Sequence, residues 1–348
     1  MSDTPVSAGE TLSSTGDTLS STGDTPFSTG DTPAPAAPTP SGDTAQIIDQ
    51  GYRSYDGPRT GLAGAARSVV RYSVRHTLGL GRPARHKILP WLAVVIALVP
   101  AVVFVGLAVV LDIDLISDEI LPDYHQYYGF ITTALFFYCG IVVPDILVSD
   151  RRSGMLQLYL STPLQRWSYL GSKALAVALT LAVLTIGPVL FLLVAYTIEG
   201  SGPDGLVEWL KIFVRIIAAG AAISAAFTAA SLAAASLTDR RAFASVGVIL
   251  LLWGSGFVTL ALVEAADLSE RIYAFDLGGI ADEFKNRIYG VEGVDFMGGE
   301  APSEDDDFSP GAGRARLSTM FVAAANLAWV AAGSAVVWWR YRRLAMSR

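Results

Sequence analysis

The sequence has little of what soluble enzymes use for chemistry. Its 348 residues include one cysteine, Cys139, so no disulfide can form within the chain and thiols cannot build a zinc cluster. Its three histidines, His76, His86 and His125, show no metal-ligand spacing. Charged residues make up only 16% of the chain, whereas 52% are hydrophobic. A chain of this length with so few charges is too apolar for a soluble protein, and the composition indicates a protein of the lipid bilayer.

Phosphate-binding motifs are also missing. The stretch GSK at 171–173 lacks the upstream glycine of a phosphate loop, so we expect the chain to bind no ATP by itself. Residues 79–84 have the spacing of a dinucleotide-binding fingerprint, but they follow a basic segment rather than a strand and include Pro83. We therefore expect this chain to have no enzyme activity, no cofactor and no metal site of its own.

Residues 1–50 have no hydrophobic run. They carry a near-repeat, TLSSTGD at 11–17, TLSSTGD at 18–24 and TPFSTGD at 25–31. Segments of Ser, Thr, Gly and Pro cannot bury enough apolar surface to offset the entropy lost on ordering, so the sequence predicts a disordered tail. The start has neither the basic region nor the apolar region of a signal peptide, and we expect the first membrane span to act as its own insertion signal.

Residues 51–87 are strongly basic and contain one acid, Asp56. Within them, Arg67, Arg71 and Arg75 recur every four residues between apolar positions. This pattern predicts a basic amphipathic helix over about 62–80 that lies on the membrane surface. A solvated helix is the alternative interpretation.

Six apolar stretches follow, each long enough to cross roughly 30 Å of hydrocarbon as a helix, and all but the second, which runs past Asp145, are uncharged. They are residues 88–111, 124–148, 174–198, 216–238, 242–263 and 317–339. The sequence thus predicts an all-α polytopic membrane protein with six transmembrane helices in a domain of residues 88–348. In the fourth stretch alanine recurs every four residues, a small-residue face that predicts burial against neighbouring helices: Ala218, Ala222, Ala226, Ala230 and Ala234.

The orientation follows from the basic residues. With the N-terminus in the cytoplasm, eighteen lysines and arginines lie inside and seven outside, so the positive-inside rule places both termini in the cytoplasm. The segment 264–316 then becomes an external acidic loop, which we expect to be exposed. Five of the six stretches contain no ionisable group, and the exception is Asp145 near the cytoplasmic end of the second. Asp145 is either a structural, interfacial residue or a coupling residue.

The segment 149–173, SDRRSGMLQLYLSTPLQRWSYLGSK, lies in the cytoplasm in this orientation. Thr162 precedes a proline and is pushed out of helical geometry, so a short helix must end there. Arg151 and Arg152 are expected at its rim, beside an apolar patch of Met155, Leu156, Leu158, Tyr159 and Leu160. The segment is either a docking element for a cytoplasmic partner or an interfacial re-entry helix without one.

Residues 144–173, PDILVSDRRSGMLQLYLSTPLQRWSYLGSK, and residues 51–61, GYRSYDGPRTG, resemble type 2 ABC exporter permeases. The resemblance covers residues 47–348. It implies six spans in a prokaryotic plasma membrane, a homodimer or a paired permease, surrounding lipids, and separate ABC ATP-binding subunits that hold ATP and Mg²⁺. By position, the helix near 62–80 becomes the connecting helix and residues 150–163 become the coupling helix. The implied partner-binding residues are Asp150, Arg151, Arg152, Gly154, Leu156, Leu158, Tyr159, Leu160 and Pro163.

The function expected from this resemblance is that of a membrane-spanning permease subunit, which forms the substrate pathway of an ATP-driven ABC exporter. The alternative is an ion-driven carrier or channel without an ATPase partner, which would depend on Asp145 more than on Leu156 or Tyr159. A membrane enzyme is a third class, but it would need paired polar residues facing each other inside the spans. Lipids, peptides, antibiotics and ions are all compatible with the sequence as substrates.

Overall fold

The computed structural model describes residues 57, 61–81, 83–110, 122–155, 159, 164–291 and 310–344. The chain divides into a unit of residues 1–57 and a unit of residues 58–348, and all described helices belong to the second. The predicted tail, residues 1–50, lies outside the described residues. So do residues 156–158 and 160–163 of the predicted coupling helix, which include four predicted partner-binding residues: Leu156, Leu158, Leu160 and Pro163.

All regular structure in the described ranges is helical, which confirms the predicted all-α class. The α-helices are α1 (Gly61–Thr77), α2 (Ile88–Val110), α3 (Tyr128–Phe137), α4 (Val143–Arg152), α6 (Arg166–Glu199), α7 (Gly205–Leu237), α8 (Arg241–Ile249), α9 (Ser255–Leu260), α10 (Leu277–Tyr289), α11 (Pro310–Ala315) and α12 (Thr319–Leu344). Three π-helical turns are η3 (Tyr138–Val142), η4 (Leu250–Gly254) and η5 (Ala261–Ala265), and two 3-10 helices are η1 (Ala84–His86) and η6 (Glu270–Phe275).

Six helical stretches are long and apolar enough to cross a membrane, as the sequence predicts: Ile88–Val110, Tyr128–Arg152, Arg166–Glu199, Gly205–Leu237, Arg241–Ala265 and Thr319–Arg343. The third and fourth begin earlier in the chain than predicted. At 1.5 Å per residue each is about 50 Å long, so it extends beyond the hydrocarbon layer and carries polar residues at its end. The length of the uncharged stretch therefore underestimates the length of these two helices.

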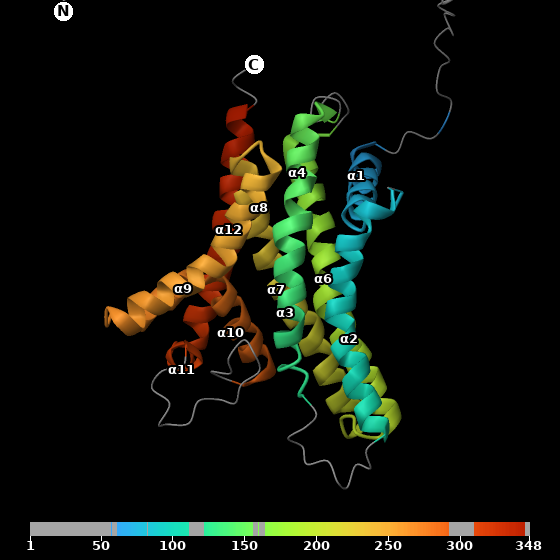
Figure 1. Cartoon of the computed structure of the whole chain (residues 1–348), viewed down its shortest axis with the longest axis vertical. Coiled ribbons are helices and arrows are strands. Elements are labelled where there is room, and N and C mark those ends of the chain that lie inside the picture. Colours follow the sequence, from blue (N-terminus) through green and yellow to red (C-terminus); the bar gives the residue numbers. More distant parts are fainter. Residues whose placement is uncertain are drawn as a thin grey trace, which may run out of the picture. The chain divides into compact units, whose positions relative to one another are not determined.

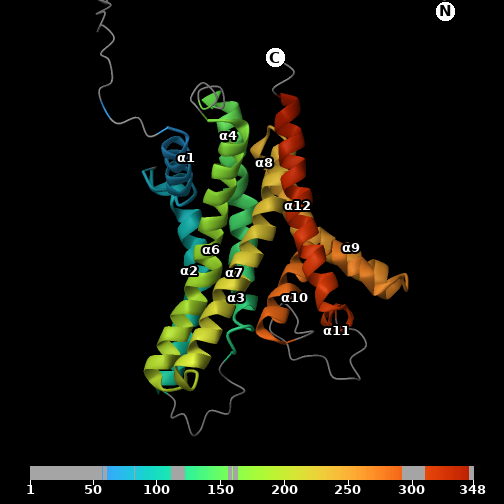
Figure 2. The same ribbon diagram turned by 180° about the vertical axis from the view of Figure 1, so that it is seen from behind.

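Helix α7 lies at the centre of the packing and contacts α4, α6, α8, α10 and α12 (Figures 1 and 2). A Cβ atom on Gly333 of α12 would lie 2.7 Å from the carbonyl oxygen of Ala229 on α7, so these two backbones touch directly. The predicted small-residue face is confirmed in the second half of the span, where Ala226 and Ala230 are buried, but Ala218 is exposed. Small residues thus permit close helix approach where α12 covers α7, and Gly220 of α7 does the same against α6.

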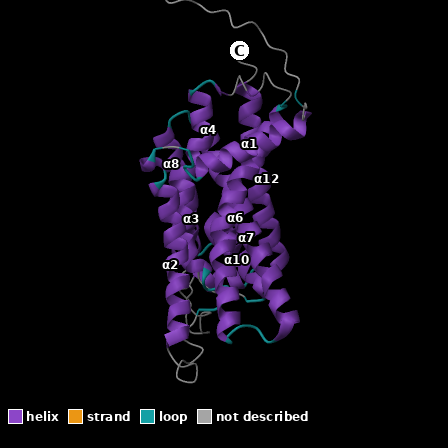
Figure 3. Ribbon diagram, turned by 90° about the vertical axis from the view of Figure 1, so that its right-hand side faces the viewer, coloured by secondary structure: helices purple, strands orange, loops and turns teal. Residues whose placement is uncertain are grey.

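Helix α1 forms as expected and is amphipathic. Val69, Ser73 and Thr77 are buried, whereas Arg67 and Arg71 are exposed. Its buried face packs against α6, where the hydroxyls of Thr77 and Thr180 lie 3.1 Å apart. Figure 3 shows α1 running across the other helices, near the end of the bundle at which the C-terminus lies.

The described part of the segment 264–316 is not the exposed loop that the sequence predicts, and residues 292–309 lie outside the described residues. It contains α10, a buried helix that packs against α7 and α12. Two of its acids are neutralised by nearby bases: the carboxylate of Asp282 lies 2.8 Å from Lys285, and that of Glu283 lies 2.7 Å from Arg287. Buried charges are tolerated when they are paired, and composition does not reveal the pairing.

Helix α9 diverges from its neighbours after η4 (Figure 1). Its side chains include Phe257, 69% exposed, and Val258, 58% exposed, and Trp253 just before it is 54% exposed. Exposed apolar side chains on a membrane-spanning helix are the surface that lipid covers. The fifth span therefore exposes most of its apolar side chains, and its second half also turns away from the neighbouring helices.

Candidate coupling junction and membrane cavity

The predicted coupling segment starts from a buried ion pair. Asp150, on α4, has its carboxylate 2.7 Å from the ammonium of Lys173 on α6, and it accepts a hydrogen bond of 2.8 Å from the hydroxyl of Tyr169. The exposed fractions of Asp150, Tyr169 and Lys173 are 7%, 1% and 2%. Because α4 precedes the segment and α6 follows it, this pair joins its two ends.

Of the predicted apolar patch, the structure describes Met155 and Tyr159. The ring centre of Tyr159 lies 5.5 Å from that of Tyr169, and the ammonium of Lys173 lies 5.7 Å from the centre of the Tyr159 ring. Burial, together with the charge of Asp150, raises the pKa of the Tyr159 hydroxyl. Tyr159 therefore rests half-buried against α6.

Arg151 closes the C-terminal end of α7. Its guanidinium donates hydrogen bonds to the carbonyl oxygens of Ser236 (2.8 Å), Ala235 (2.6 Å) and Thr238, and it lies 3.3 Å from the carboxylate of Asp239. The last carbonyls of a helix have no partner within the helix, and a cation there also meets the negative end of the helix dipole. Arg151 thus ties α4 to α7.

The expected position of Arg151 at an exposed rim is wrong, because its side chain is only 7% exposed. Arg152, Ser153 and Gly154 do face outward. Gly154 has a φ of 70°, in the left-handed region that glycine tolerates, and it follows the end of α4. Of the predicted partner-binding residues, the structure thus brings Asp150, Arg151 and Tyr159 close to the ends of α6 and α7, and their partner-binding role stays a prediction.

Sequence reasoning missed Tyr169 and Lys173 as site residues. The sequence places Lys173 at the end of the cytoplasmic segment 149–173, whereas α6 already begins at Arg166 and contains it. The available signal is the spacing of four between Tyr169 and Lys173, which places both on one face of a helix. We use the name "junction" below for Asp150, Arg151, Tyr169 and Lys173.

Asp145 joins three helices near the junction. Its carboxylate lies 3.9 Å from the imidazole of His76 on α1 and 3.6 Å from the guanidinium of Arg241 on α8. Arg241 also donates a hydrogen bond of 3.3 Å to the carbonyl oxygen of Ile141. These contacts favour the structural interpretation of Asp145 over the coupling one.

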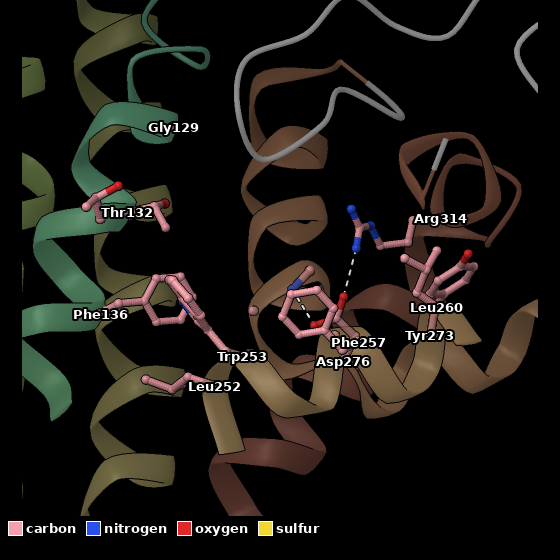
Figure 4. Close-up of a pocket in the computed structure, with 14 residues that line it drawn as sticks. Gly129, Thr132, Phe136, Leu252, Trp253, Phe257, Leu260, Tyr273, Asp276 and Arg314 are labelled. Carbon is pink, nitrogen blue, oxygen red and sulfur yellow. Dashed lines mark hydrogen bonds and ion pairs between the residues drawn. The ribbon is translucent and has the colours of Figure 1, made fainter. Parts of the chain in front are cut away.

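A cavity of about 430 Å³ lies between α3 on one side and η4, α9, η6 and α10 on the other (Figure 4). One part of its wall is aromatic, where Phe136 and Trp253 meet edge to face at 5.6 Å. Phe257 and Leu260 continue this wall, and Thr132 and Thr133 are the hydroxyl side chains of the α3 side. The cavity therefore has a largely apolar lining within the membrane-spanning part.

The polar end of the cavity is an ion pair. Asp276 accepts a hydrogen bond of 3.0 Å from the backbone N–H of Gly279 and so caps α10, and its other oxygen lies 2.8 Å from the guanidinium of Arg314 (Figure 4). A Cβ atom on Gly279 would lie 2.1 Å from the same guanidinium, so only glycine permits this approach. Beside it, the hydroxyl of Tyr273 donates to Glu264 at 3.0 Å, and burial raises the pKa of that hydroxyl.

The described residues contain no cluster of three or more His, Cys, Asp or Glu side chains that could hold a metal ion. No curated protein matches the sequence. Residues 119–275 match the family described as ABC-2 family transporter protein. The matched range runs from the second span through the fifth and includes Asp150, Arg151, Lys173 and most of the cavity lining. Over residues 119–275 the chain is thus similar to ABC-2 type permeases, and its six apolar helices are those of a multi-pass membrane protein.

Proposed function

We propose that this permease is the membrane subunit of an ATP-driven exporter and that separate ABC ATP-binding subunits drive it through residues 150–163. The observation that carries the proposal is the junction. Asp150 is fixed to α6 through Lys173, and Arg151 is fixed to α7 through three backbone carbonyls. A force applied to the segment would therefore act on α4, α6 and α7 together.

The route from the junction to the cavity runs along the second span. Helix α4 continues through the π-turn η3 into α3, whose residues Gly129, Thr132, Thr133 and Phe136 line the cavity. π-turns inside α-helices often mark functional positions, because their wider ladder tolerates local rearrangement. A Cβ atom on Gly140 in η3 would lie 2.9 Å from the side chain of Ile249, so α8 packs closely at this turn. Movement of α4 would thus reach both walls of the cavity.

In this proposal the chain itself binds no nucleotide, and ATP with Mg²⁺ binds in the partner subunit. A second copy of the permease, or a paired permease, completes the membrane part, and the cavity belongs to the substrate pathway. The end of α4, helix α1 and the end of α12 lie at the same end of the bundle (Figures 1 and 2). We assign this end to the cytoplasm of a prokaryotic cell, since the basic residues concentrate there.

The orientation is tested by cysteine labelling in intact cells. A cysteine introduced at Ser303 should react with an impermeant reagent, whereas one at Ser347 should not. Labelling at position 347 alone would reverse the assignment.

Coupling is tested with a tagged chain. We expect an ATP-binding protein to co-purify with the wild-type permease and to hydrolyse ATP when both are reconstituted. Replacing Leu156 and Tyr159 together by Asp should abolish co-purification, because each apolar side chain buried in a partner groove contributes on the order of 1.5–3 kcal/mol. Leu62→Asp is the matched control, since that apolar side chain is exposed but lies outside residues 150–163. Retention of the ATPase by the double variant, or transport without any ATPase, would contradict the proposal.

A further inference from the structure

A second cavity, of about 440 Å³, lies on the polar face of α1. It is lined by Ser68, Arg71, Tyr72, Arg75 and His76 and is closed by the turn that follows the helix. The cavity is separate from the junction and from the apolar cavity beside α9. Neither the predicted coupling function nor the family match assigns it a role.

Packing holds the arginines of this cavity outward. Arg71 and Arg75 are four residues apart and lie one turn above each other on the same face of the helix. The opposite face is fixed against α6 by Thr77, whose hydroxyl lies 3.1 Å from that of Thr180 and whose carbonyl oxygen accepts a hydrogen bond of 3.2 Å from Tyr138. Since α1 cannot rotate without breaking these contacts, both guanidinium groups remain at the surface.

The turn after α1 places the cavity at the edge of the apolar layer. Gly79 has a φ of 68°, and a Cβ atom on it would lie 2.5 Å from the carbonyl oxygen of His86, so the chain folds back tightly. The first span then starts at Ile88, which is 62% exposed, and continues with Trp91, which is 52% exposed. Tryptophan is enriched where hydrocarbon meets headgroups. The cavity therefore lies at headgroup level.

The cavity carries positive charge without a compensating acid of its own. In the described part of the chain, Arg71 and Arg75 have no acidic side chain within 4.0 Å. The carboxylate beside His76 is that of Asp145, which also contacts Arg241 at 3.6 Å. Two guanidinium groups one turn apart offer several N–H donors to one anion, and guanidinium geometry matches phosphate oxygens.

We propose that this cavity binds the phosphate of an anionic phospholipid headgroup, with Arg71 and Arg75 as its donors. Tyr72, 54% exposed, and Leu80, 40% exposed, border the same cavity and offer apolar contact to the glycerol and acyl part of a lipid. This apolar border favours a lipid over free phosphate. The assignment does not depend on the proposed coupling to an ATPase.

The test uses the purified full-length chain in detergent and counts bound lipids by native mass spectrometry. The probes are phosphatidylglycerol and phosphatidylcholine with identical acyl chains. We expect phosphatidylglycerol to bind more tightly than phosphatidylcholine. R71Q/R75Q should weaken phosphatidylglycerol binding roughly 25-fold, because each basic residue near an anionic headgroup contributes about five-fold. Glutamine has nearly the helix propensity of arginine, so α1 should persist in this variant.

The matched control is R67Q/K87Q, which removes two charges from exposed positions of the same region outside the cavity. It should weaken binding by less than about five-fold, because only diffuse attraction is lost. R71K/R75K keeps the charge and the fold but loses the paired donors, and it should lie between the wild type and R71Q/R75Q. Equal losses in R71Q/R75Q and R67Q/K87Q would overturn the proposal, as would equal binding of the two lipids. Displacement of phosphatidylglycerol by equimolar inorganic phosphate would show a free-phosphate site and overturn the lipid assignment.

Discussion

Two groups of buried charges lie toward opposite ends of the bundle and are built differently (Figure 1). The bonds of the junction described above join different helices, α4 to α6 and α4 to α7. The other group, here called the α10 cluster, consists of Asp276, Asp282, Glu283, Lys285, Arg287 and Arg314. Two of its ion pairs join residues three or four apart on α10 itself, and the third reaches α11.

The difference shows that similar chemistry can serve two purposes. Pairs within one helix neutralise that helix and let a polar segment be buried. Arg287 and Lys285 also hold α10 to the backbone at Leu317 and His125, but none of these bonds reaches residues 150–163. Pairs between helices fix the helices to one another, so a displacement of one is passed to the next. We therefore expect damage at the junction to affect stability and coupling, and damage at the α10 cluster to affect stability alone.

The largest effect is expected from Lys173→Met. It leaves the carboxylate of Asp150 buried without its cation, which destabilises a protein by about 3–5 kcal/mol. Thermal unfolding of the purified permease measures the change, and Lys211→Met, at an exposed lysine of α7, is the control. The double variant D150N/K173M should recover much of the stability but not the coupling of ATP hydrolysis to transport. Unchanged unfolding of the single variant would contradict the assigned pair.

The next largest effect is expected from Gly279→Ala. The added Cβ would lie 2.1 Å from both the guanidinium of Arg314 and the carboxylate of Asp276, so the pair must separate, at a cost of about 3 kcal/mol. Gly187→Ala is the matched control, because a Cβ on Gly187 of α6 meets no atom within 4 Å. Co-purification of the ATPase should be unchanged in both variants. Loss of co-purification in Gly279→Ala would remove the distinction between the two groups.

A smaller effect is expected from Arg151→Ala. Hydrogen bonds from a charged group contribute about 1.5–3 kcal/mol, and this variant removes the donor that closes the C-terminal end of α7. Arg152→Ala should change unfolding by less than about 0.5 kcal/mol, because that side chain is exposed. The melting temperature and the transport rate of the two variants show whether Arg151 and Arg152 contribute differently to stability and coupling. Equal effects would mean that α4 is not tied to α7.

The smallest effect is expected from the protonation of His125 as the pH falls. This residue lies beside the α10 cluster. Burial lowers the pKa of its imidazole, and Lys285 acts in the same direction, whereas Asp123 and Asp282 oppose them. The unfolded chain then takes up a proton at higher pH than the folded protein, so stability falls as the pH drops below about 6.5 and is unaffected above it. His125→Gln should show a flatter dependence of melting temperature between pH 7.5 and 5.5. A wild type that gains stability toward pH 5.5 would contradict the sign.

Much of the fold follows from the sequence because membrane spans depend on one quantity, the length of an apolar run. Six such runs predict six spans, and the spacing of Arg67, Arg71 and Arg75 predicts the basic face of α1. The sequence does not predict the burial of charged residues that are buried only because they form ion pairs. In the sequence, Asp282 and Lys285 have the pattern of a solvent-exposed helix, and only the fold shows that α7 and α12 cover them. Likewise, Lys173 has the pattern of a loop residue, and only the fold shows its partner Asp150.

The π-turn η3 also limits what a linear pattern can reveal about the second span. One extra residue in a helical turn shifts every following side chain by about 100° around the axis. The face of α3 toward the cavity and the face of α4 toward the junction therefore belong to different stripes of the sequence, and no single helical wheel displays both. Loss of one residue between Tyr138 and Val142 would leave the span apolar and almost equally long, yet it would turn the cavity wall away from the cavity while the junction stayed in place. The phase of this helix is thus a property that evolution can alter with one codon.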